Sequence, residues 1–295
     1  MIDYSEIFIG SEADRVKVLV ELLTVPEVAH DVFRGPRMPD GVGRIYGGQV
    51  IAQALAAAQQ TVDDDRSPHS LHAYFLRGGD ENYPIDLRVA RDFDGRSFSN
   101  RRVIASQNGV PILNLASSFQ RPGDVASHQD PMPGIAMPED LPDELDISPI
   151  ISKAREDPRQ SGMLLHRPYE VRIPGDLMEP GRDPAKPVYY WFRMLSALPD
   201  DAALHRLAIA YLSDYGLLFT AAIRHNLKIF SPKARVASLD HAIWFHQPAR
   251  ADEWLAYVLD SDWAGNSRGF TRGRFYTRDG RLVASTAQEG MIREA

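Results

Sequence analysis

Two β-hairpins, one in each half of the chain, constrain its fold more than any other feature. Residues 99–119 form two alternating apolar and polar runs around Asn108-Gly109, and residues 269–290 do the same around Asp279-Gly280. Asn-Gly and Asp-Gly favour type I′ turns, in which both central residues need a positive φ. The recurrence of the same unit predicts an internal duplication.

Each half also contains one segment that is apolar on nearly every side, residues 50–58 in the first half and residues 217–223 in the second. A helix that is apolar all round is buried all round. In both halves a short strand precedes this segment and several strands follow it. One helix wrapped by a curved antiparallel sheet is the hotdog arrangement, and two copies side by side protect the edge that one copy exposes. We therefore predict an α+β fold, a tandem (double) hotdog.

The boundaries of the two halves follow from a change in composition. The stretch from Gly123 to Pro149 is rich in Pro, Asp and Glu and has no periodic apolar pattern. We predict an N-terminal hotdog half over residues 1–122, a linker over residues 123–160 and a C-terminal hotdog half over residues 161–295. The first half begins with an amphipathic helix, for which Ser11 and Asp14 form the capping signal.

Composition excludes several classes of function. The chain has no cysteine, which removes disulfides, thiolate metal sites and cysteine nucleophiles. Its net charge of −7, without a dense basic stripe, argues against a nucleic-acid partner. The amino terminus does not resemble a signal peptide, and no segment looks long and apolar enough to cross a membrane. We expect a cytoplasmic protein without stable membrane insertion.

Several motifs recur together in one order along the chain. They are Gly47-Gly48-Gln49-Val50, residues 72–80, Leu212-Ser213-Asp214-Tyr215, residues 238–246 and residues 283–290. This set resembles the type II acyl-CoA thioesterases, the TesB-like double-hotdog enzymes. The resemblance extends over nearly the whole chain outside the linker, so it is more specific than any single motif.

The resemblance implies a function and a catalytic trio. The family aspartate matches Asp214, the hydroxyl residue, Thr or Ser in relatives, matches Ser238, and the glutamine matches Gln288. The expected reaction is hydrolysis of medium- to long-chain fatty acyl-CoA to free fatty acid and CoA, without a cofactor or a metal. The family also suggests a homo-oligomer, either a dimer or a tetramer.

These residue types suit hydrolysis of a thioester. Asp214 lies at a predicted helix start, where capping and the helix dipole should keep its carboxylate ionised and able to accept a proton from water. Ser238 and Gln288 can hold one water against that carboxylate. Gly47 and Gly48 let a backbone approach closely and are candidates for binding the developing oxyanion.

The coenzyme phosphates require cations. Arg101, Arg102, Arg268 and Arg272 are candidates, since alternating strands could direct them toward one mouth of the site. The alternative is that these arginines belong to a solvated strand face.

The two halves are not equivalent in the residues that carry the chemistry. Gln49 stands opposite Asp214 in the helix alignment, and Ser117 stands opposite Gln288 in the hairpin alignment. The counterpart of Ser238 is ambiguous between His69 and Ser70. Because position 49 has no carboxylate, we predict one active site per chain, lined by both halves.

Other readings of the sequence are weaker. Residues 265–269 match the G-x-S-x-G nucleophile elbow around Ser267, but a strand and not a helix should follow, and no histidine occurs after His246. His241 and His246 are an odd number of residues apart on a strand, which makes them a poor metal pair. Two alternatives stay open: a hotdog hydratase or dehydratase, and a non-catalytic acyl-CoA binder or sensor.

Overall fold

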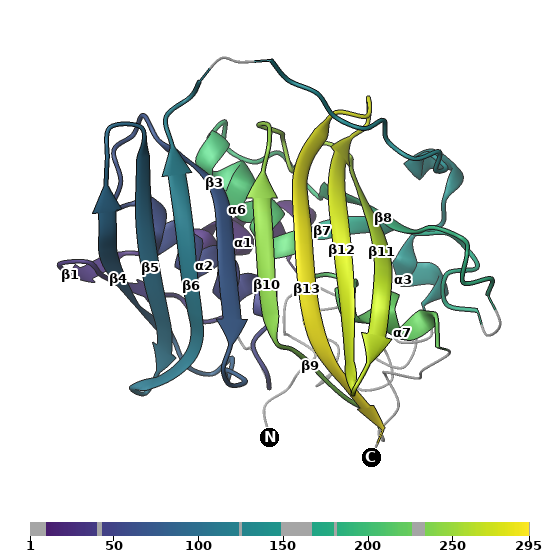
Figure 1. Ribbon diagram of the computed structural model, residues 1–295, viewed down its shortest axis with the longest axis horizontal. Helices are drawn as coiled ribbons and strands as arrows, with labels where there is room; N and C mark the ends of the chain where they lie inside the picture. The colour runs from purple at the N-terminus through teal and green to yellow at the C-terminus, as the bar shows by residue number, and fades with distance from the viewer. Residues whose placement is uncertain are drawn as a thin grey trace.

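All strands of the described part of the chain join one antiparallel sheet, and the helices cover one of its faces (Figure 1). The sheet has 13 strands in the order β1-β2-β4-β5-β6-β3-β10-β13-β12-β11-β8-β7, with β9 paired to β13. The structure is a computed structural model, and it describes residues 10–39, 43–123, 126–148, 167–179, 182–225 and 234–294.

The N-terminal half supplies one side of this sheet and two helices. Its strands are β1 (Glu27–Ala29), β2 (Val32–Gly35), β3 (Ser67–Phe75), β4 (Ile85–Asp94), β5 (Phe98–Gln107) and β6 (Val110–Gln120), and its helices are α1 (Glu12–Leu23) and α2 (Gly47–Gln59). The Ser11 hydroxyl and the Asp14 carboxylate form a complete capping box on α1, which confirms the predicted leading helix.

The C-terminal half supplies the other side. Its strands are β7 (Tyr169–Arg172), β8 (Val188–Met194), β9 (Ala234–Ser238), β10 (Asp240–Phe245), β11 (Leu255–Gly265), β12 (Arg268–Thr277) and β13 (Leu282–Glu294), and its helices are α6 (Ala202–Leu212) and α7 (Leu217–Ile223). The segment of the chain that connects the halves contains two short helices, η2 (Pro138–Asp140) and α3 (Glu144–Ile147). The predicted end of the linker at residue 160 lies outside the described residues.

The two halves meet where β3 pairs with β10. These strands are antiparallel, with a register that runs from Tyr74 opposite Asp240 to Ser70 opposite Trp244. Outward from this seam, the order β3-β6-β5-β4-β2-β1 on one side corresponds to β10-β13-β12-β11-β8-β7 on the other. The strand order therefore repeats, as the duplicated hairpins predict, and the edge strand of each half is covered by the other.

The two hairpin turns differ in detail. Asn108 and Gly109 both have a positive φ, 50° and 76°, so the predicted type I′ turn between β5 and β6 is confirmed. Between β12 and β13 only Gly280 is positive, with φ 86°, so the predicted type I′ turn at Asp279-Gly280 is wrong. The Gly280 N–H donates to the Thr277 carbonyl at 2.9 Å, which makes a longer turn closed by a left-handed glycine.

A third hairpin contains the G-x-S-x-G sequence. Asn266 and Ser267, with φ 49° and 62°, form the tight turn that joins β11 directly to β12. A nucleophile elbow requires a helix after the serine, and here a strand follows it. The exclusion of Ser267 as an elbow nucleophile is confirmed on this structural criterion.

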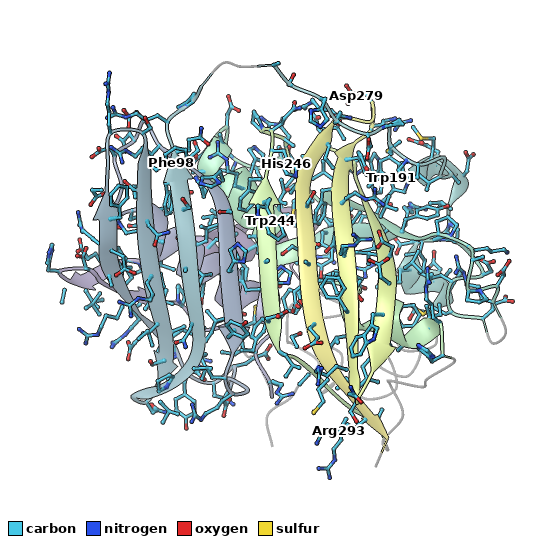
Figure 2. The ribbon with its side chains drawn as sticks, in the orientation of Figure 1. Phe98, Trp191, Trp244, His246, Asp279 and Arg293 are labelled. Carbon is cyan, nitrogen blue, oxygen red and sulfur yellow. The ribbon has the colours of Figure 1, made fainter. Side chains whose placement is uncertain are left out.

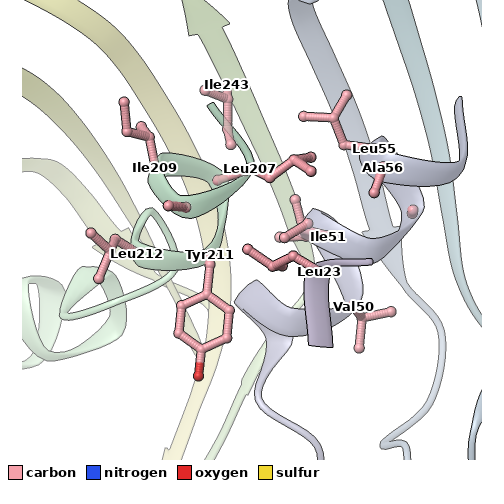
Figure 3. Packing of buried hydrophobic residues seen from close by; sticks show 14 of the residues in the cluster. Leu23, Val50, Ile51, Leu55, Ala56, Leu207, Ile209, Tyr211, Leu212 and Ile243 are labelled. Carbon is pink, nitrogen blue, oxygen red and sulfur yellow. The ribbon is translucent and has the colours of Figure 1, made fainter. Parts of the chain in front are cut away.

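The helices pack on one face of the sheet, behind the seam between its two halves (Figure 1). Every residue of α2 from Gly48 to Ala58 is buried, as predicted for an all-apolar segment. The second such segment forms α7, but only Leu217, Thr220, Ala221 and Ala222 are buried there, so the predicted burial on all sides is wrong for this segment. The helix α6, which packs directly on α2, was not predicted from the sequence. Figure 3 shows Leu207 of α6 beside Ile51 and Leu55 of α2. This contact joins the cores of the two halves.

The helical stretch Ala202–Ile223 meets the length and composition criteria of a membrane-spanning helix, with a mean hydropathy of 1.2. The expectation that no segment is long and apolar enough is therefore wrong. In the structure, 61% of its most apolar window is buried inside the protein. Its apolar character follows from its place in a core that both halves share.

Candidate active site

Asp214 lies in the short turn between α6 and α7. The helix α6 ends at Leu212, and Gly216, with φ 76°, is the N-cap of α7. Asp214 is therefore not a helix N-cap, and the prediction that it begins and caps the second buried helix is wrong. A left-handed backbone at Gly216 is what lets the helical stretch break and restart so soon after α6.

Residues of the connecting segment hold this turn in place. The hydroxyl of Tyr215 donates to the carboxylate of Glu144 on α3, and the buried Arg167 guanidinium donates to the same carboxylate. Both Glu144 and Arg167 are buried, so the pair is shielded from solvent. The connection between the halves thus supports the turn that carries Asp214.

The structure brings together the three residues of the predicted trio. The Ser238 hydroxyl, at the end of β9, donates to Asp214 Oδ1 at 3.4 Å, and Gln288 Nε2, on β13, donates to Ser238 Oγ at 3.0 Å. Gln288 also hydrogen-bonds the Asp214 carboxylate. The three side chains form a closed triangle of hydrogen bonds.

The N-terminal half completes this site through the first turn of α2. The Gly48 N–H donates to the Asp214 carboxylate. A Cβ at Gly47 would lie 2.5 Å from Asp214 Oδ2, and a Cβ at Gly48 would lie 2.1 Å from the Tyr211 carbonyl oxygen. Both positions therefore require glycine, and the site is lined by both halves, as predicted.

The electrostatics of Asp214 differ from the expectation. Part of its surface stays accessible, but protein atoms enclose the rest, and this loss of hydration raises the pKa of its carboxyl to about 7. Hydrogen bonds from Gln288, Ser238 and the Gly48 N–H act in the opposite direction but do not compensate. The expectation of a carboxylate kept ionised by its own helix is wrong. The helix whose N-terminus faces it belongs to the other half.

The sequence analysis missed the part played by His241. It was interpreted only as a structural histidine, but its Nδ1 lies 2.6 Å from Gln288 Oε1 and its Nε2 lies 2.9 Å from Ser213 Oγ. The position of His241 in the motif Ser238-Leu239-Asp240-His241 was the available signal. His246, by contrast, is exposed at the end of β10 and bonds Ser285 (Figure 2).

The structure contradicts the placement of Arg101 at a substrate mouth. Its side chain is only 1% exposed, and its guanidinium donates to Thr61, Asp94 and the Phe93 carbonyl oxygen. All of this bonding is internal to the N-terminal half. Arg101 is a buried structural residue, since a strand directs neighbouring side chains to opposite faces.

The other three candidate arginines lie on the outer face of the sheet. Arg102 follows the buried Arg101, and Arg268 and Arg272 alternate with the buried Gly269 and Thr271 on β12. Each is paired with a carboxylate: Arg102 with Asp92, Arg268 with Glu289, and Arg272 with Asp260 and Asp262. This arrangement favours the alternative of a solvated strand face.

One group in the described part of the chain could hold a metal ion. Ligand atoms of Glu27, His30 and Asp31 lie within 4.8 Å of one another at the β1–β2 turn. Glu27 and His30 are exposed, and Asp31 already forms a bidentate pair with Arg91. The group lies at the edge of the sheet in the N-terminal half and includes none of the trio.

Two family models match the chain, one in each half. A model described as acyl-CoA thioesterase N-terminal domain matches residues 36–120, and a model described as acyl-CoA thioesterase matches residues 164–291. Acyl-CoA thioesterase 2 of Haemophilus influenzae is 36% identical over 95% of this chain and 99% of its own. The chain belongs to the acyl-CoA thioesterase family.

One solved structure agrees with this membership, and a more distant one agrees with the fold alone. The structure of acyl-CoA thioesterase II TesB2 from Mycobacterium marinum has a TM-score of 0.78 and 39% identity, and covers 94% of this chain and 97% of that one. A protein with a hot dog fold from Alicyclobacillus acidocaldarius has a TM-score of 0.72 at 19% identity, covering 93% and 97%. The predicted family and the tandem hotdog fold are confirmed.

Proposed function

We propose that this acyl-CoA thioesterase hydrolyses medium- to long-chain fatty acyl-CoA, using a water activated by Asp214, Ser238 and Gln288. One observation carries the proposal: a partly accessible carboxylate, with a pKa raised to about 7, closes a hydrogen-bonded triangle with a hydroxyl and an amide. A base with a pKa near the working pH combines availability with proton affinity.

The water oxygen attacks the thioester carbonyl carbon while Asp214 takes its proton. The developing oxyanion needs an N–H donor. In the first turn of α2, the Gly48 N–H bonds Asp214, and the N–H groups of Gln49 and Val50 bond the Tyr46 carbonyl oxygen. The Gly47 N–H is then the first-turn donor available for the oxyanion.

Collapse of the tetrahedral intermediate breaks the carbon–sulfur bond and releases CoA as a thiolate. A free thiol has a pKa of about 8.5, above that of the Asp214 carboxyl, so the proton moves from Asp214 to sulfur. This transfer restores the ionised carboxylate. The products are a fatty acid and CoA, and one residue serves as base and then as acid.

The hydratase or dehydratase alternative lacks its base. That chemistry requires a histidine beside an acid, and the histidine nearest the trio is His241. Burial lowers the pKa of His241 to about 4, and both of its ring nitrogens are occupied by Gln288 and Ser213. We therefore favour hydrolysis over proton transfer at an acyl carbon.

Steady-state release of free thiol from acyl-CoAs of graded chain length, acetyl to stearoyl, tests the proposal. We expect kcat/KM to rise from short chains to medium and long chains. Binding of acyl-CoA without turnover at any length would instead identify the non-catalytic binder or sensor. Homo-oligomerisation and a cytoplasmic location remain predictions, and sedimentation of the purified enzyme tests the first.

A further inference from the structure

His241 connects the trio to the backbone of α6. It lies at the start of β10 and is 1% exposed. Its Nδ1 is 2.6 Å from Gln288 Oε1, and its Nε2 is 2.9 Å from the hydroxyl oxygen of Ser213. Ser213 directly precedes Asp214 in the chain, so a chain of hydrogen bonds runs from the Asp214 turn back to Gln288.

The protonation of His241 determines what this chain of bonds can do. Burial lowers the pKa of His241 to about 4, so the ring is neutral at neutral pH. A neutral imidazole has one N–H donor and one acceptor nitrogen. Only one of its two partners can therefore receive a proton from it.

The amide of Gln288 selects which nitrogen carries the proton. Its Nε2 donates to Ser238 Oγ and its side chain also bonds the Asp214 carboxylate, which accepts protons only. Its Oε1 then faces His241 Nδ1, which must carry the N–H. The Ser213 hydroxyl donates to the Ala210 carbonyl oxygen at 2.7 Å, and the acceptor Nε2 of His241, 2.9 Å from Ser213 Oγ, shares that proton as the second acceptor of a bifurcated hydrogen bond.

We propose that His241 is a positioning residue for thioester hydrolysis, whose Nδ1–H holds the Gln288 amide with its N–H groups toward Ser238 and Asp214. This inference rests on the proposed function of the trio. With the amide reversed, its carbonyl oxygen would face the carboxylate, and Ser238 and Asp214 would each lose a donor. His241 prevents that reversal without touching the substrate.

The N-terminal half lacks a hydrogen-bonding pair at the positions that correspond to His241 and Gln288. Leu71 stands opposite Ser117 in the pairing of β3 with β6, where the C-terminal half has His241 beside Gln288. Leu71 cannot donate a hydrogen bond, and Ser117 Oγ is buried without a partner among the described residues. The polar pair is present only in the half that carries Asp214.

Two substitutions separate positioning from packing. His241→Ala removes the donor and leaves Gln288 Oε1 unsatisfied, so we expect kcat to fall about tenfold or more with KM nearly unchanged. His241→Asn keeps an N–H near the position of Nδ1 and should recover most of kcat. His205→Asn is the matched control, because His205 is also buried but accepts a hydrogen bond from the Ala251 N–H and bonds no member of the trio among the described residues.

A double-mutant cycle with Gln288→Ala tests whether His241 acts through Gln288. In that background, His241→Ala should cause little further loss of kcat. An equal fractional loss in both backgrounds, or a folded His241→Ala enzyme with wild-type kcat, would overturn the proposal. If Asp214→Asn is fully active, the proposed function fails instead.

The tautomer of His241 can be measured in the intact wild-type enzyme, independently of how the variants fold. In ¹⁵N-histidine-labelled enzyme, assigned by the loss of one signal in His241→Asn, we expect a neutral ring with its proton on Nδ1 at pH near neutrality. A proton on Nε2, or a charged ring, contradicts the proposal whatever the enzyme hydrolyses.

Discussion

The two halves of this acyl-CoA thioesterase share a strand order but not a chemistry. The C-terminal half has Asp214, Gln288 and His241, and these side chains are joined by hydrogen bonds. The strand pairing places Ser117 and Leu71 where the C-terminal half has Gln288 and His241, and the sequence alignment of the helices sets Gln49 opposite Asp214. Both amide atoms of Gln49 and the Ser117 hydroxyl are buried without partners among the described residues.

This difference shows which features belong to the fold and which to the site. The hairpins, the all-apolar helix and the seam strand recur because they build the sheet and the core. The connected polar network does not recur. The N-terminal half instead contributes backbone, since the Gly48 N–H at the start of α2 reaches the carboxylate of the other half. The C-terminal half thus carries the side chains of the candidate site, and the N-terminal half contributes a backbone donor to it.

The largest expected effect separates Asp214 from its counterpart Gln49. Asp214→Asn keeps the size of the side chain but removes the base, so kcat should fall by about 10²–10⁴-fold. Gln49→Met should leave kcat near the wild-type value. Thioester hydrolysis by both purified variants measures this difference, with the melting temperature as the control for folding. An equal loss of kcat in both variants would contradict the functional difference between the halves.

Gln288 and Ser117 make the second pair. Gln288→Ala removes donors to Ser238 and Asp214, and we expect kcat to fall about ten- to a hundredfold. Ser117→Ala removes a hydroxyl without a partner and should leave kcat unchanged. The loss from Gln288→Ala should not multiply with that from Asp214→Asn, because both serve one water. Full multiplicativity would argue that they act separately.

The pKa of Asp214 predicts the pH dependence. Because the carboxyl has a raised pKa of about 7, it holds a proton below that pH and cannot accept another from water. We expect log kcat/KM to fall with a slope of about one below pH 7. Ser238→Ala should move this limb to higher pH, since its hydrogen bond lowers the pKa. A profile that stays flat to pH 5 would contradict the assignment.

The raised pKa of Asp214 also predicts a pH-dependent difference in stability between the wild type and Asp214→Asn. A carboxyl whose folded pKa is raised above its unfolded value of 3.8 favours folding at low pH, and this contribution is lost as the pH rises through about 7. Asp214→Asn should therefore be more stable than the wild type above pH 7, by roughly 1–3 kcal/mol after screening by partial exposure. The difference should shrink near pH 4.

The smallest expected effect concerns stability within α2. Gln53 Nε2 donates to the carbonyl oxygens of Leu22 and Pro36, so Gln53→Met should lower the free energy of unfolding by about 1–3 kcal/mol. Gln49 has no such bonds, and Gln49→Met should be neutral or stabilising. Urea denaturation of both variants measures this, and a large loss at Gln49 would show that its amide has a structural partner.

Much of the site was predictable because it depends on local patterns. The alternation around Asn108-Gly109 set the strands, whereas Asp214, Ser238 and Gln288, which the fold brings together, were predicted from the resemblance of their motifs to a known family. These features depend on short-range periodicity and on residue identity. Both can be read directly from a sequence.

The rest depends on contacts between distant segments. The helix α6 was missed because it is buried against α2, which belongs to the other half of the chain. The pKa of Asp214 depends on enclosure by both halves. The burial of Arg101 depends on Thr61 and Asp94, and a strand pattern alone did not show which of Arg101 and Arg102 points inward.

The central claim is that Asp214 activates a water and does not itself attack the thioester. A single turnover with enzyme in excess over acyl-CoA, carried out in ¹⁸O-labelled water, tests it most directly. The account predicts that the fatty acid from this first turnover carries one solvent ¹⁸O in its carboxyl group. An unlabelled fatty acid, with ¹⁸O found instead in the Asp214 carboxyl, would show that Asp214 is the nucleophile and contradict the account.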